Sequence, residues 1–232
     1  MHAVTARPDR VVVVAGTGTE VGKTWCAARI IEHLRAAGVT VGARKPAQSF
    51  DPDDPHPTDA AVLSAATGEA EDDVCAPQRC YPVAFAPPMA AAALGRPPLF
   101  LSELVAASSS WPTPAPAIGF VELAGGVRSP LAGDGDGVAL TAALAPDSVL
   151  LVADAGLGTI NSVRLTVEAL ASQCRVPVVV LLNRYDPGVE LHERNWASLS
   201  HHDGLDVVTT PADAAERVRV LRPHDPLRPN HP

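Results

Sequence analysis

The chain has 232 residues, of which 47% are hydrophobic and 4% are aromatic, and its formal net charge is −8. That length suits one well-buried α/β domain, and the acidic balance with few aromatic residues argues against a nucleic-acid surface. No apolar run reaches the ~20 residues of a membrane helix, so we expect a cytoplasmic protein that binds neither nucleic acid nor membrane.

We expect a flexible arm at residues 1–10, a single domain over 11–221 and a proline-rich tail at 222–232. The domain opens with a β-branched block at 11–15, which indicates a buried strand. A helix over 25–37 follows, closed by Gly38. A strand and a helix joined by a loop ending in Gly-Lys-Thr are typical of a phosphate-binding site, because loop amides and the helix dipole attract an anion there.

The connecting loop carries the most specific signal in the chain. From Gly16 to Thr24 it reads Gly-Thr-Gly-Thr-Glu-Val-Gly-Lys-Thr, one residue longer than the common spacing from its first glycine. We expect Lys23 to contact phosphate and the Thr24 hydroxyl to bind Mg²⁺. The expected nucleotide-binding residues of the loop are Gly18, Thr19, Glu20, Val21, Gly22, Lys23 and Thr24.

The remaining elements alternate between strands and helices. We expect strands at 39–43, 118–121, 148–153, 176–182 and 205–208, and helices at 58–67, 88–94, 102–109, 138–145, 160–174 and 189–199. Residues 50–57 and 72–88 are expected to be irregular. This order predicts an α/β fold with a doubly wound, mainly parallel sheet and helices on both faces, in the P-loop class.

Polar residues end several of these strands, and in such a sheet ligands bind at the carboxyl ends. Converging there should be Lys45, Ser49, Glu122, Asp154, Asn183 and Thr210. Glu122 could hold a metal or be a solvated loop acid, and Asp59 could do so too or only favour its helix dipole. Lys45 could neutralise a developing charge. Asn183 could read an adenine edge or cap a turn.

The cysteines and histidines suggest no separate chemistry. Cys75 and Cys80 have no second Cys/His pair to complete a zinc site, so we interpret them, like Cys26 and Cys174, as structural thiols.

Over roughly residues 11–211 the chain resembles the dethiobiotin synthetases. The resemblance rests first on the loop Gly-Thr-x-Thr-Glu-Val-Gly-Lys-Thr. Supporting matches are Lys45-Pro46 with Ser49, Asp59-Ala60, Glu122 with Ala124-Gly125-Gly126, Gly158-Thr159-Ile160-Asn161, and the strand ending in Asn183.

The resemblance implies an ATP-dependent cyclo-ligase that joins CO₂ to 7,8-diaminononanoate through a carbamate that ATP phosphorylates. It implies Mg²⁺ on Thr24, Asp59 and Glu122, with Lys23 and Lys45 stabilising the transferred phosphoryl group and the carbamate. Thr19 and Ser49 would contact the diamine and carbamate. Asn183 would contact adenine, with Thr210 and Pro211 beside it. A homodimer with the segment near Asn161 at its interface is also implied.

Two positions depart from the family pattern. Leu123 and Phe50 stand where the family usually has glycine, and a Cβ there can obstruct a ligand that approaches the backbone closely. The alternative is therefore a divergent P-loop paralogue that binds nucleotide but uses another acceptor, or is a non-catalytic nucleotide switch. A switch of the partitioning ATPase kind would carry a second lysine early in the loop, where this chain has Thr-Gly-Thr. An amidating synthetase would need an additional glutaminase domain.

Overall fold

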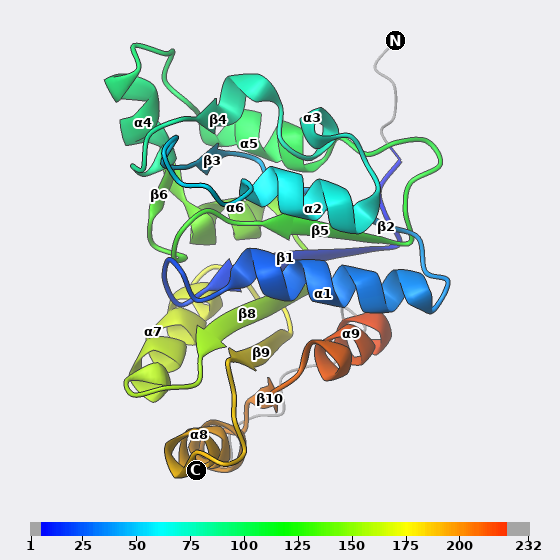
Figure 1. The fold of residues 1–232 in the computed structure, drawn as a ribbon, viewed down its shortest axis with the longest axis vertical. Coiled ribbons are helices and arrows are strands. Elements are labelled where there is room, and N and C mark those ends of the chain that lie inside the picture. Colours follow the sequence, from blue (N-terminus) through cyan, green and yellow to red (C-terminus); the bar gives the residue numbers. More distant parts are fainter. Residues whose placement is uncertain (1–5, 222–232) are drawn as a thin grey trace.

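A six-stranded parallel sheet forms the centre of the computed structural model, which describes residues 6–221 (Figure 1). The strand order is β10-β9-β8-β1-β5-β2, and every neighbouring pair is parallel. The strands are β1 (Arg10–Gly16), β2 (Val41–Arg44), β5 (Ile118–Glu122), β8 (Ser148–Asp154), β9 (Val178–Asn183) and β10 (Asp206–Val208). The expected doubly wound parallel fold is confirmed.

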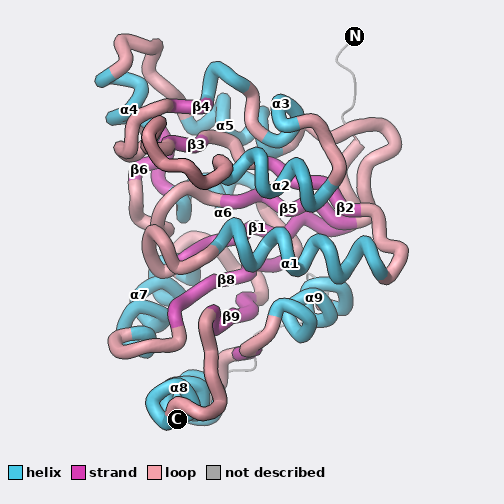
Figure 2. The backbone as a smooth tube through the Cα atoms, viewed as in Figure 1, coloured by secondary structure: helices cyan, strands magenta, loops and turns pink. Residues whose placement is uncertain are grey.

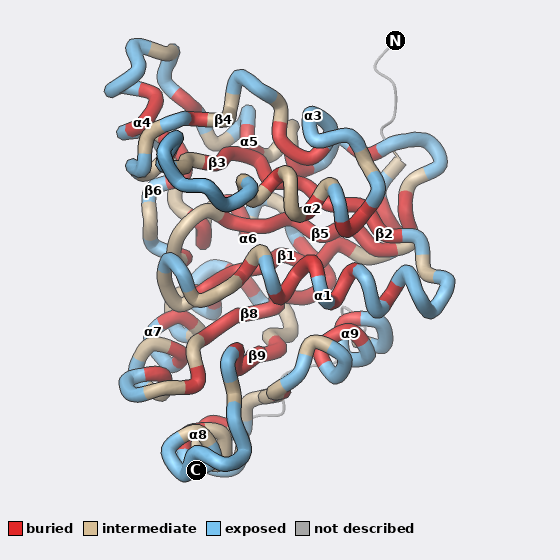
Figure 3. Tube along the Cα trace, in the orientation of Figure 1, coloured by how far each residue is buried: buried red, intermediate tan, exposed pale blue. Residues whose placement is uncertain are grey.

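Helices cover both faces of the sheet, because successive strand side chains point in opposite directions. On β1, Val12 and Val14 face a core shared with α1 (Lys23–Ala36), α2 (Asp59–Thr67) and α9 (Pro211–Val220). Val11 and Val13 face the opposite core, shared with α4 (Pro87–Ala93), α5 (Leu101–Ser108), α6 (Gly137–Leu144) and α7 (Thr159–Ala171). The buried backbone in Figure 3 accordingly follows the strands.

Short elements fill the connections (Figure 2). Between β2 and β5, β3 (Gln48–Ser49) pairs in parallel with β4 (Cys80–Tyr81), with α3 (Glu71–Val74) and a 3₁₀ turn at Pro77–Arg79 leading into β4. After β5, β6 (Pro130–Ala132) and β7 (Gly135–Asp136) form an antiparallel pair. After β9, α8 (Glu190–Ala197) continues into a π-helical turn at Ser198–His202.

Local signals at helix ends explain the boundaries of α2 and the start of α9. Thr58 caps α2 by accepting a hydrogen bond from the amide of Ala61 at 3.2 Å, and Gly68 ends the helix with a φ of 78°, both as expected. The sequence reasoning did not include α9, although Thr210 caps it and Pro211 opens its first turn.

Other boundaries differ from the expectation. The segment at 72–88 is only partly irregular, since it contains the end of α3, the 3₁₀ turn, β4 and the start of α4. Residues 6–10 of the expected arm lie against the domain: Pro8 is buried, and Arg7 pairs with Asp147 at 3.0 Å. The expected tail at 222–232 lies outside the described residues. Over residues 6–221, no helix combines the length and apolarity that crossing a bilayer requires.

Candidate functional site

The loop between β1 and α1 has a backbone conformation that only particular residues allow. Gly22 at the start of α1 has a φ of 89°, and Glu20 has a φ of 59°. A Cβ on Gly16 would lie 2.9 Å from Cδ of Lys23 and 3.0 Å from the carbonyl oxygen of Gly18, so the tight turn out of β1 requires glycine there. This supports Gly16 as the first glycine of the longer loop.

Lys23 lies over the loop, where its Nζ donates to the carbonyl oxygen of Gly18 at 2.9 Å. No side chain caps α1, so its first amides keep their hydrogen-bonding capacity beside this buried ammonium. Burial, with the nearby charge of Lys45, holds the pKa of Lys23 below its ordinary value. Unsatisfied amides, a helix N-terminus and a desolvated cation together suit an anion such as a phosphate group.

Two consecutive residues at the end of β9, the last residue of the strand and the one that follows it, hold the other side of the loop. The Asn183 amide donates to the carbonyl oxygen of Val21 at 2.9 Å, and the Arg184 guanidinium donates to that of Glu20 at 3.0 Å. Arg184 also pairs with Asp154 at 2.9 Å, and it has a φ of 58°. Sequence reasoning singled out Asn183 and Asp154 but missed Arg184, whose position directly after a strand-end residue was the available signal.

A compact cluster of charges lies beside Lys23, at the carboxyl end of β5. Lys45 Nζ is 2.6 Å from Glu122 Oε1 and 2.6 Å from Asp59 Oδ2. The Thr24 hydroxyl oxygen is 2.7 Å from Asp59 Oδ1 and 2.8 Å from Glu122 Oε1, and its one proton can be donated to only one of them at a time. The side chains of Lys45 and Glu122 are 1% exposed, whereas that of Asp59 is 43% exposed. The structure thus brings together four side chains that lie far apart in the sequence.

The ionisation of this cluster follows from burial and mutual attraction. Burial raises the pKa of Glu122 above its ordinary value, although Lys45 opposes the shift. Burial acts against the charge of Lys45, but Asp59 and Glu122 outweigh it and raise the pKa of that lysine. Burial likewise acts against the Asp59 carboxylate, but Lys45 outweighs it and lowers the pKa of Asp59. We therefore assign a protonated Lys45 shared between two carboxylates.

Thr24, Asp59 and Glu122 present oxygen atoms only, which is the donor set of a hard cation such as Mg²⁺. The second carboxylate oxygen of Glu122, Oε2, is buried and has no hydrogen-bond partner in the structure, so a donor atom remains available. Residues 6–221 contain no group of three or more His, Cys, Asp or Glu side chains arranged to hold a metal. Mg²⁺ needs no such group, because one or two carboxylates with phosphate and water usually complete its shell.

The acceptor is expected near Thr19 and Ser49, so we use the name acceptor side for β3, β4 and the turn after β5. The Ser49 hydroxyl is buried without a hydrogen-bond partner, and the Phe50 amide donates to the carbonyl oxygen of Tyr81 at 3.0 Å. Thr19 is exposed, and its methyl carbon would lie 3.9 Å from a Cβ on Gly125. The expected residues Thr19 and Ser49 thus keep free hydroxyl groups near this turn and at the end of β3.

The two departures from the family pattern differ in their surroundings. Leu123 is fully buried and belongs to the core shared with α4–α7, where its Cδ1 would lie 3.1 Å from a Cβ on Gly137. Its side chain therefore points into the hydrophobic core. Phe50 is only half-buried at the end of β3. Of these two residues, Phe50 is therefore the one whose side chain could obstruct a ligand.

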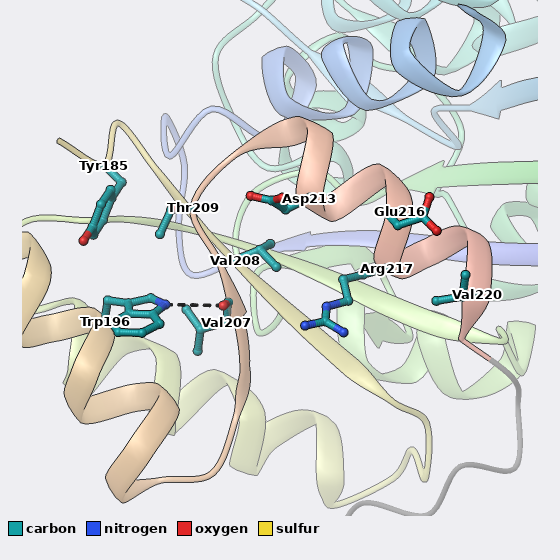
Figure 4. Close-up of a pocket in the computed structure, with 9 residues that line it drawn as sticks. All are labelled: Tyr185, Trp196, Val207, Val208, Thr209, Asp213, Glu216, Arg217 and Val220. Carbon is teal, nitrogen blue, oxygen red and sulfur yellow. Dashed lines mark hydrogen bonds between the residues drawn. The ribbon is translucent and has the colours of Figure 1, made fainter. Parts of the chain in front are cut away.

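The base side was expected to involve Asn183, Thr210 and Pro211. Asn183 contacts the loop as described, while Thr210 and Pro211 form the cap and first position of α9. A cavity of about 490 Å³ lies against β10, α8 and α9 (Figure 4). None of the residues that line this cavity belongs to the charge cluster. The cavity is lined by Tyr185, Trp196, Val207, Val208, Thr209, Asp213, Glu216, Arg217 and Val220.

Comparison with known proteins adds both fold and family. A family model described as an AAA domain matches residues 10–210. A putative plasmid partition protein of Borrelia burgdorferi B31, solved with AMPPNP, has a TM-score of 0.51 at 12% identity, over 92% of this chain and 89% of its own. The signal recognition particle receptor FtsY of Elizabethkingia anophelis, solved with GDP, has a TM-score of 0.51 at 16% identity, over 90% and 58%. Both likenesses show the fold alone.

Closer relatives exist in sequence. The ATP-dependent dethiobiotin synthetase BioD of Anaeromyxobacter dehalogenans (strain 2CP-C) is 37% identical over 221 residues, which cover 91% of this chain and 95% of the relative. BioD of Haloferax mediterranei is 34% identical over 218 residues, covering 91% and 86%.

The fold and its loop therefore define a protein of the P-loop nucleotide-binding class. The sequence relatives are more specific, and the chain belongs to the family of ATP-dependent dethiobiotin synthetases.

Proposed function

We propose that the chain closes the ureido ring of dethiobiotin from 7,8-diaminononanoate and CO₂ at the expense of ATP. Family membership assigns the chain to the ATP-dependent ligases of this type. The observation that best supports the finer proposal is the buried Lys45, held 2.6 Å from both Asp59 and Glu122 beside the phosphate loop. The reaction needs cationic charge at the place where a carbamate meets a phosphoryl group, and the location of Lys45 beside the phosphate loop supports that role.

The reaction sequence follows from the chemistry of its parts. One amine of the diamine adds to CO₂ and forms a carbamate, and a carbamate oxygen then attacks the γ-phosphorus of ATP. The bond between the γ-phosphorus and the oxygen that bridges it to the β-phosphate breaks, ADP leaves, and a mixed carbamic–phosphoric anhydride forms. The second amine attacks the carbonyl carbon, the carbon–oxygen bond to phosphate breaks, and the cyclic urea and inorganic phosphate remain.

The residues of this chain would act by position and charge. Lys23, bonded to the loop carbonyl of Gly18, would move onto the phosphates, and Lys45 would stabilise the carbamate and the transferred phosphoryl group. The unpaired hydroxyl group of Ser49 and the exposed side chain of Thr19 would orient the diamine and carbamate. The Asn183 amide, already within reach of the loop, would contact adenine, with Thr210 and Pro211 at the edge of the base site.

Thr24, Asp59 and Glu122 would hold Mg²⁺. When bound, the ion would neutralise phosphate charge and orient the phosphates for in-line transfer. The hydrogen bonds from Thr24 and Lys45 would hold these carboxylates in place before the nucleotide binds.

A homodimer is also part of the proposal. It is supported by two exposed leucines on either side of Asn161 in the sequence, since Leu157 is 91% exposed and Leu165 is 58% exposed.

A second candidate is a divergent paralogue that binds nucleotide but uses a different acceptor. The half-buried Phe50 favours it, because this residue stands where the family usually has glycine.

The two candidates are separated by incubating the chain with ATP, Mg²⁺, bicarbonate and 7,8-diaminononanoate and by following dethiobiotin by mass. The proposal predicts diamine-dependent dethiobiotin formation with one ADP per product. Nucleotide binding without product at millimolar diamine would contradict the proposal and favour the paralogue. Lys23→Ala is the control, because loss of the loop lysine should abolish turnover in either case.

A further inference from the structure

Two cysteines lie in contact at the edge of the acceptor side. Cys75 directly follows α3, Cys80 begins β4, and their sulfur atoms are 3.5 Å apart. Both are free thiols. Cys75 is buried, whereas Cys80 is partly exposed, so that one sulfur can meet a dissolved reagent and the other is held behind it. The sequence shows these residues only as a pair five positions apart, without a partner for metal binding.

The surroundings of the two sulfurs differ. The side-chain amide of Gln48 donates to the sulfur of Cys80 at 3.3 Å. The hydrogen bond with Cys75, with that from Gln48, lowers the pKa of Cys80 to about 6, and the same interaction with burial raises the pKa of Cys75. Cys80 is thus suited to be the nucleophilic thiolate, and Cys75 the thiol that resolves an oxidised Cys80.

The pair is connected to the charge cluster through a single side chain. Gln48 donates to Cys80 with its amide nitrogen and accepts with its amide oxygen from the backbone amide of Ala60, at 2.9 Å. Ala60 lies in the first turn of α2, directly after Asp59. In addition, β3 and β4 pair Gln48 with Cys80 and Ser49 with Tyr81. A displacement of Cys80 would therefore act on the ends of both elements that carry Ser49 and Asp59.

We propose that Cys75 and Cys80 form a peroxide-reactive dithiol, which closes to an intramolecular disulfide and so weakens binding at the acceptor and magnesium side. The disulfide itself does not depend on the proposed function, whereas its effect on turnover rests on it. The class of reagent is a hydroperoxide, such as hydrogen peroxide.

The electron and proton balance is complete. The Cys80 thiolate attacks one peroxide oxygen, the oxygen–oxygen bond breaks, and hydroxide leaves, giving a sulfenic acid on Cys80. The sulfur of Cys75 then attacks that sulfur, the sulfur–oxygen bond breaks, and water leaves with the Cys75 proton. The two thiols lose two electrons and two protons, and the peroxide is reduced to two waters.

Closing the bond requires movement. A disulfide has a sulfur–sulfur distance of about 2.05 Å, so the two sulfurs must approach by about 1.5 Å from their present contact. The sulfur of Cys80 is then no longer a thiolate that accepts a hydrogen bond from the side-chain amide of Gln48. Gln48 is left with only its hydrogen bond from the Ala60 amide of α2, so its side chain is less firmly held. Both changes occur where Ser49 and Asp59 are positioned.

The first experiment tests the disulfide alone. The full chain is treated with hydrogen peroxide and digested, and the peptides are identified by mass. We expect an internal link between Cys75 and Cys80 with a loss of about two mass units, reversed by dithiothreitol. In Cys75→Ser, Cys80 should instead progress to the sulfinic acid. In Cys80→Ser, peroxide should oxidise the remaining Cys75 at least about tenfold more slowly than it oxidises Cys80 in the parent.

Cys174→Ser is the matched control, since this buried thiol lies against α6 and should leave the linkage unchanged. Unreactive thiols in the native chain, or overoxidation of Cys80 at the same rate with and without Cys75, would overturn the dithiol assignment.

The second experiment tests the connection. Binding of Mg²⁺-ATP by calorimetry and, where turnover is present, the KM for the diamine are compared before and after oxidation. We expect the dissociation constant for Mg²⁺-ATP and the KM for the diamine each to rise by at least about threefold after oxidation and to return with dithiothreitol. Cys75→Ser treated in parallel should show no reversible change. A disulfide that forms without altering either quantity would overturn the connection. Because calorimetry needs no turnover, this result is distinguishable from failure of the proposed function.

Discussion

The residues expected around the phosphates and those expected around the acceptor differ in how far their side chains already hydrogen-bond to one another. On the phosphate side, Lys45, Asp59, Glu122 and Thr24 form one hydrogen-bonded cluster, and the loop is held by Asn183 and Arg184. On the acceptor side, the Ser49 hydroxyl is buried without a partner. Phosphoryl transfer depends on positioned charges, so it is reasonable that its side is assembled in advance.

The two departures from the family pattern also differ. The side chain of Leu123 belongs to the core, whereas Phe50 is only half-buried at the end of β3. Phe50 is therefore the departure that can affect an acceptor.

The largest expected effect is on Lys23. Lys23→Ala should lower kcat/KM for ATP by about 10³-fold, because the loop loses the one side-chain cation that can meet the phosphates. Its thermal stability should stay close to that of the parent, since Lys23 makes a single hydrogen bond to a carbonyl oxygen. Steady-state kinetics and thermal unfolding measure the two quantities. A variant that binds ATP as tightly as the parent would refute the phosphate-loop assignment.

The second prediction concerns the stability of the cluster. Lys45→Met should lower the free energy of unfolding by about 3–5 kcal/mol, because it leaves the fully buried Glu122 carboxylate without its cation. Adding Glu122→Gln should restore a large part of that loss, since the uncompensated charge is then absent. Urea unfolding of the parent, both single variants and the double variant measures the coupling. Additive losses would show that the two side chains do not act as a pair.

Leu123 and Phe50 should respond in opposite ways. Leu123→Ala should destabilise the fold by about 3 kcal/mol through the cavity it leaves, with no change in the KM for the diamine. Phe50→Gly should lower that KM by at least about threefold at little cost in stability, because it opens the backbone to the ligand. Urea unfolding and acceptor kinetics separate the two. A change in KM with Leu123→Ala would place its side chain in the crevice after all.

Arg184 should have a smaller effect, confined to nucleotide binding. Arg184→Met removes the bridge between the Glu20 carbonyl oxygen and Asp154, and we expect Mg²⁺-ATP to bind about threefold to tenfold more weakly. The effect is modest because the guanidinium is largely exposed. The matched control is Arg164→Met on α7, which removes an ion pair with Asp203 away from the loop. Equal losses in both variants would mean that Arg184 does not act on the loop.

The smallest expected effect is a shift in pH dependence. A thiol is alkylated as its thiolate, and the pKa of Cys80 is lowered to about 6, so the rate of its reaction with iodoacetamide should rise with pH and be half-maximal near pH 6. In Cys75→Ala the midpoint should move to higher pH, because alanine cannot make the hydrogen bond that contributes most to the lowering. An unchanged midpoint would show that Cys75 does not stabilise the thiolate.

Much of the fold could be predicted because the signals were local. The valine block of β1, the Thr58 cap and the Gly68 stop each determine their own boundary. The missed helix α9 also had local signals, in Thr210 and Pro211, but these residues were interpreted as part of a ligand site instead of a helix start.

The expected site residues could be recognised one by one in the sequence, but the contacts among them could not. Lys45, Asp59 and Glu122 were each recognisable as strand-end or helix-start residues, yet nothing in the sequence shows that one ammonium lies between two carboxylates. The contact between Cys75 and Cys80 likewise depends on the pairing of β3 with β4, which rests on two residues in each strand. The side-chain direction of Leu123 depends on the packing of α6 and was equally hidden.

The most direct test of the central claim follows oxygen from CO₂ to phosphate. In a short reaction with ¹⁸O-labelled bicarbonate, 7,8-diaminononanoate and unlabelled ATP, attack of a carbamate oxygen on the γ-phosphorus requires that one oxygen of CO₂ leave in the inorganic phosphate. We predict phosphate with a single ¹⁸O atom for each dethiobiotin formed, measured by mass spectrometry. Unlabelled phosphate formed together with dethiobiotin would contradict the mixed anhydride, and ATP hydrolysis without dethiobiotin would contradict the proposed function itself.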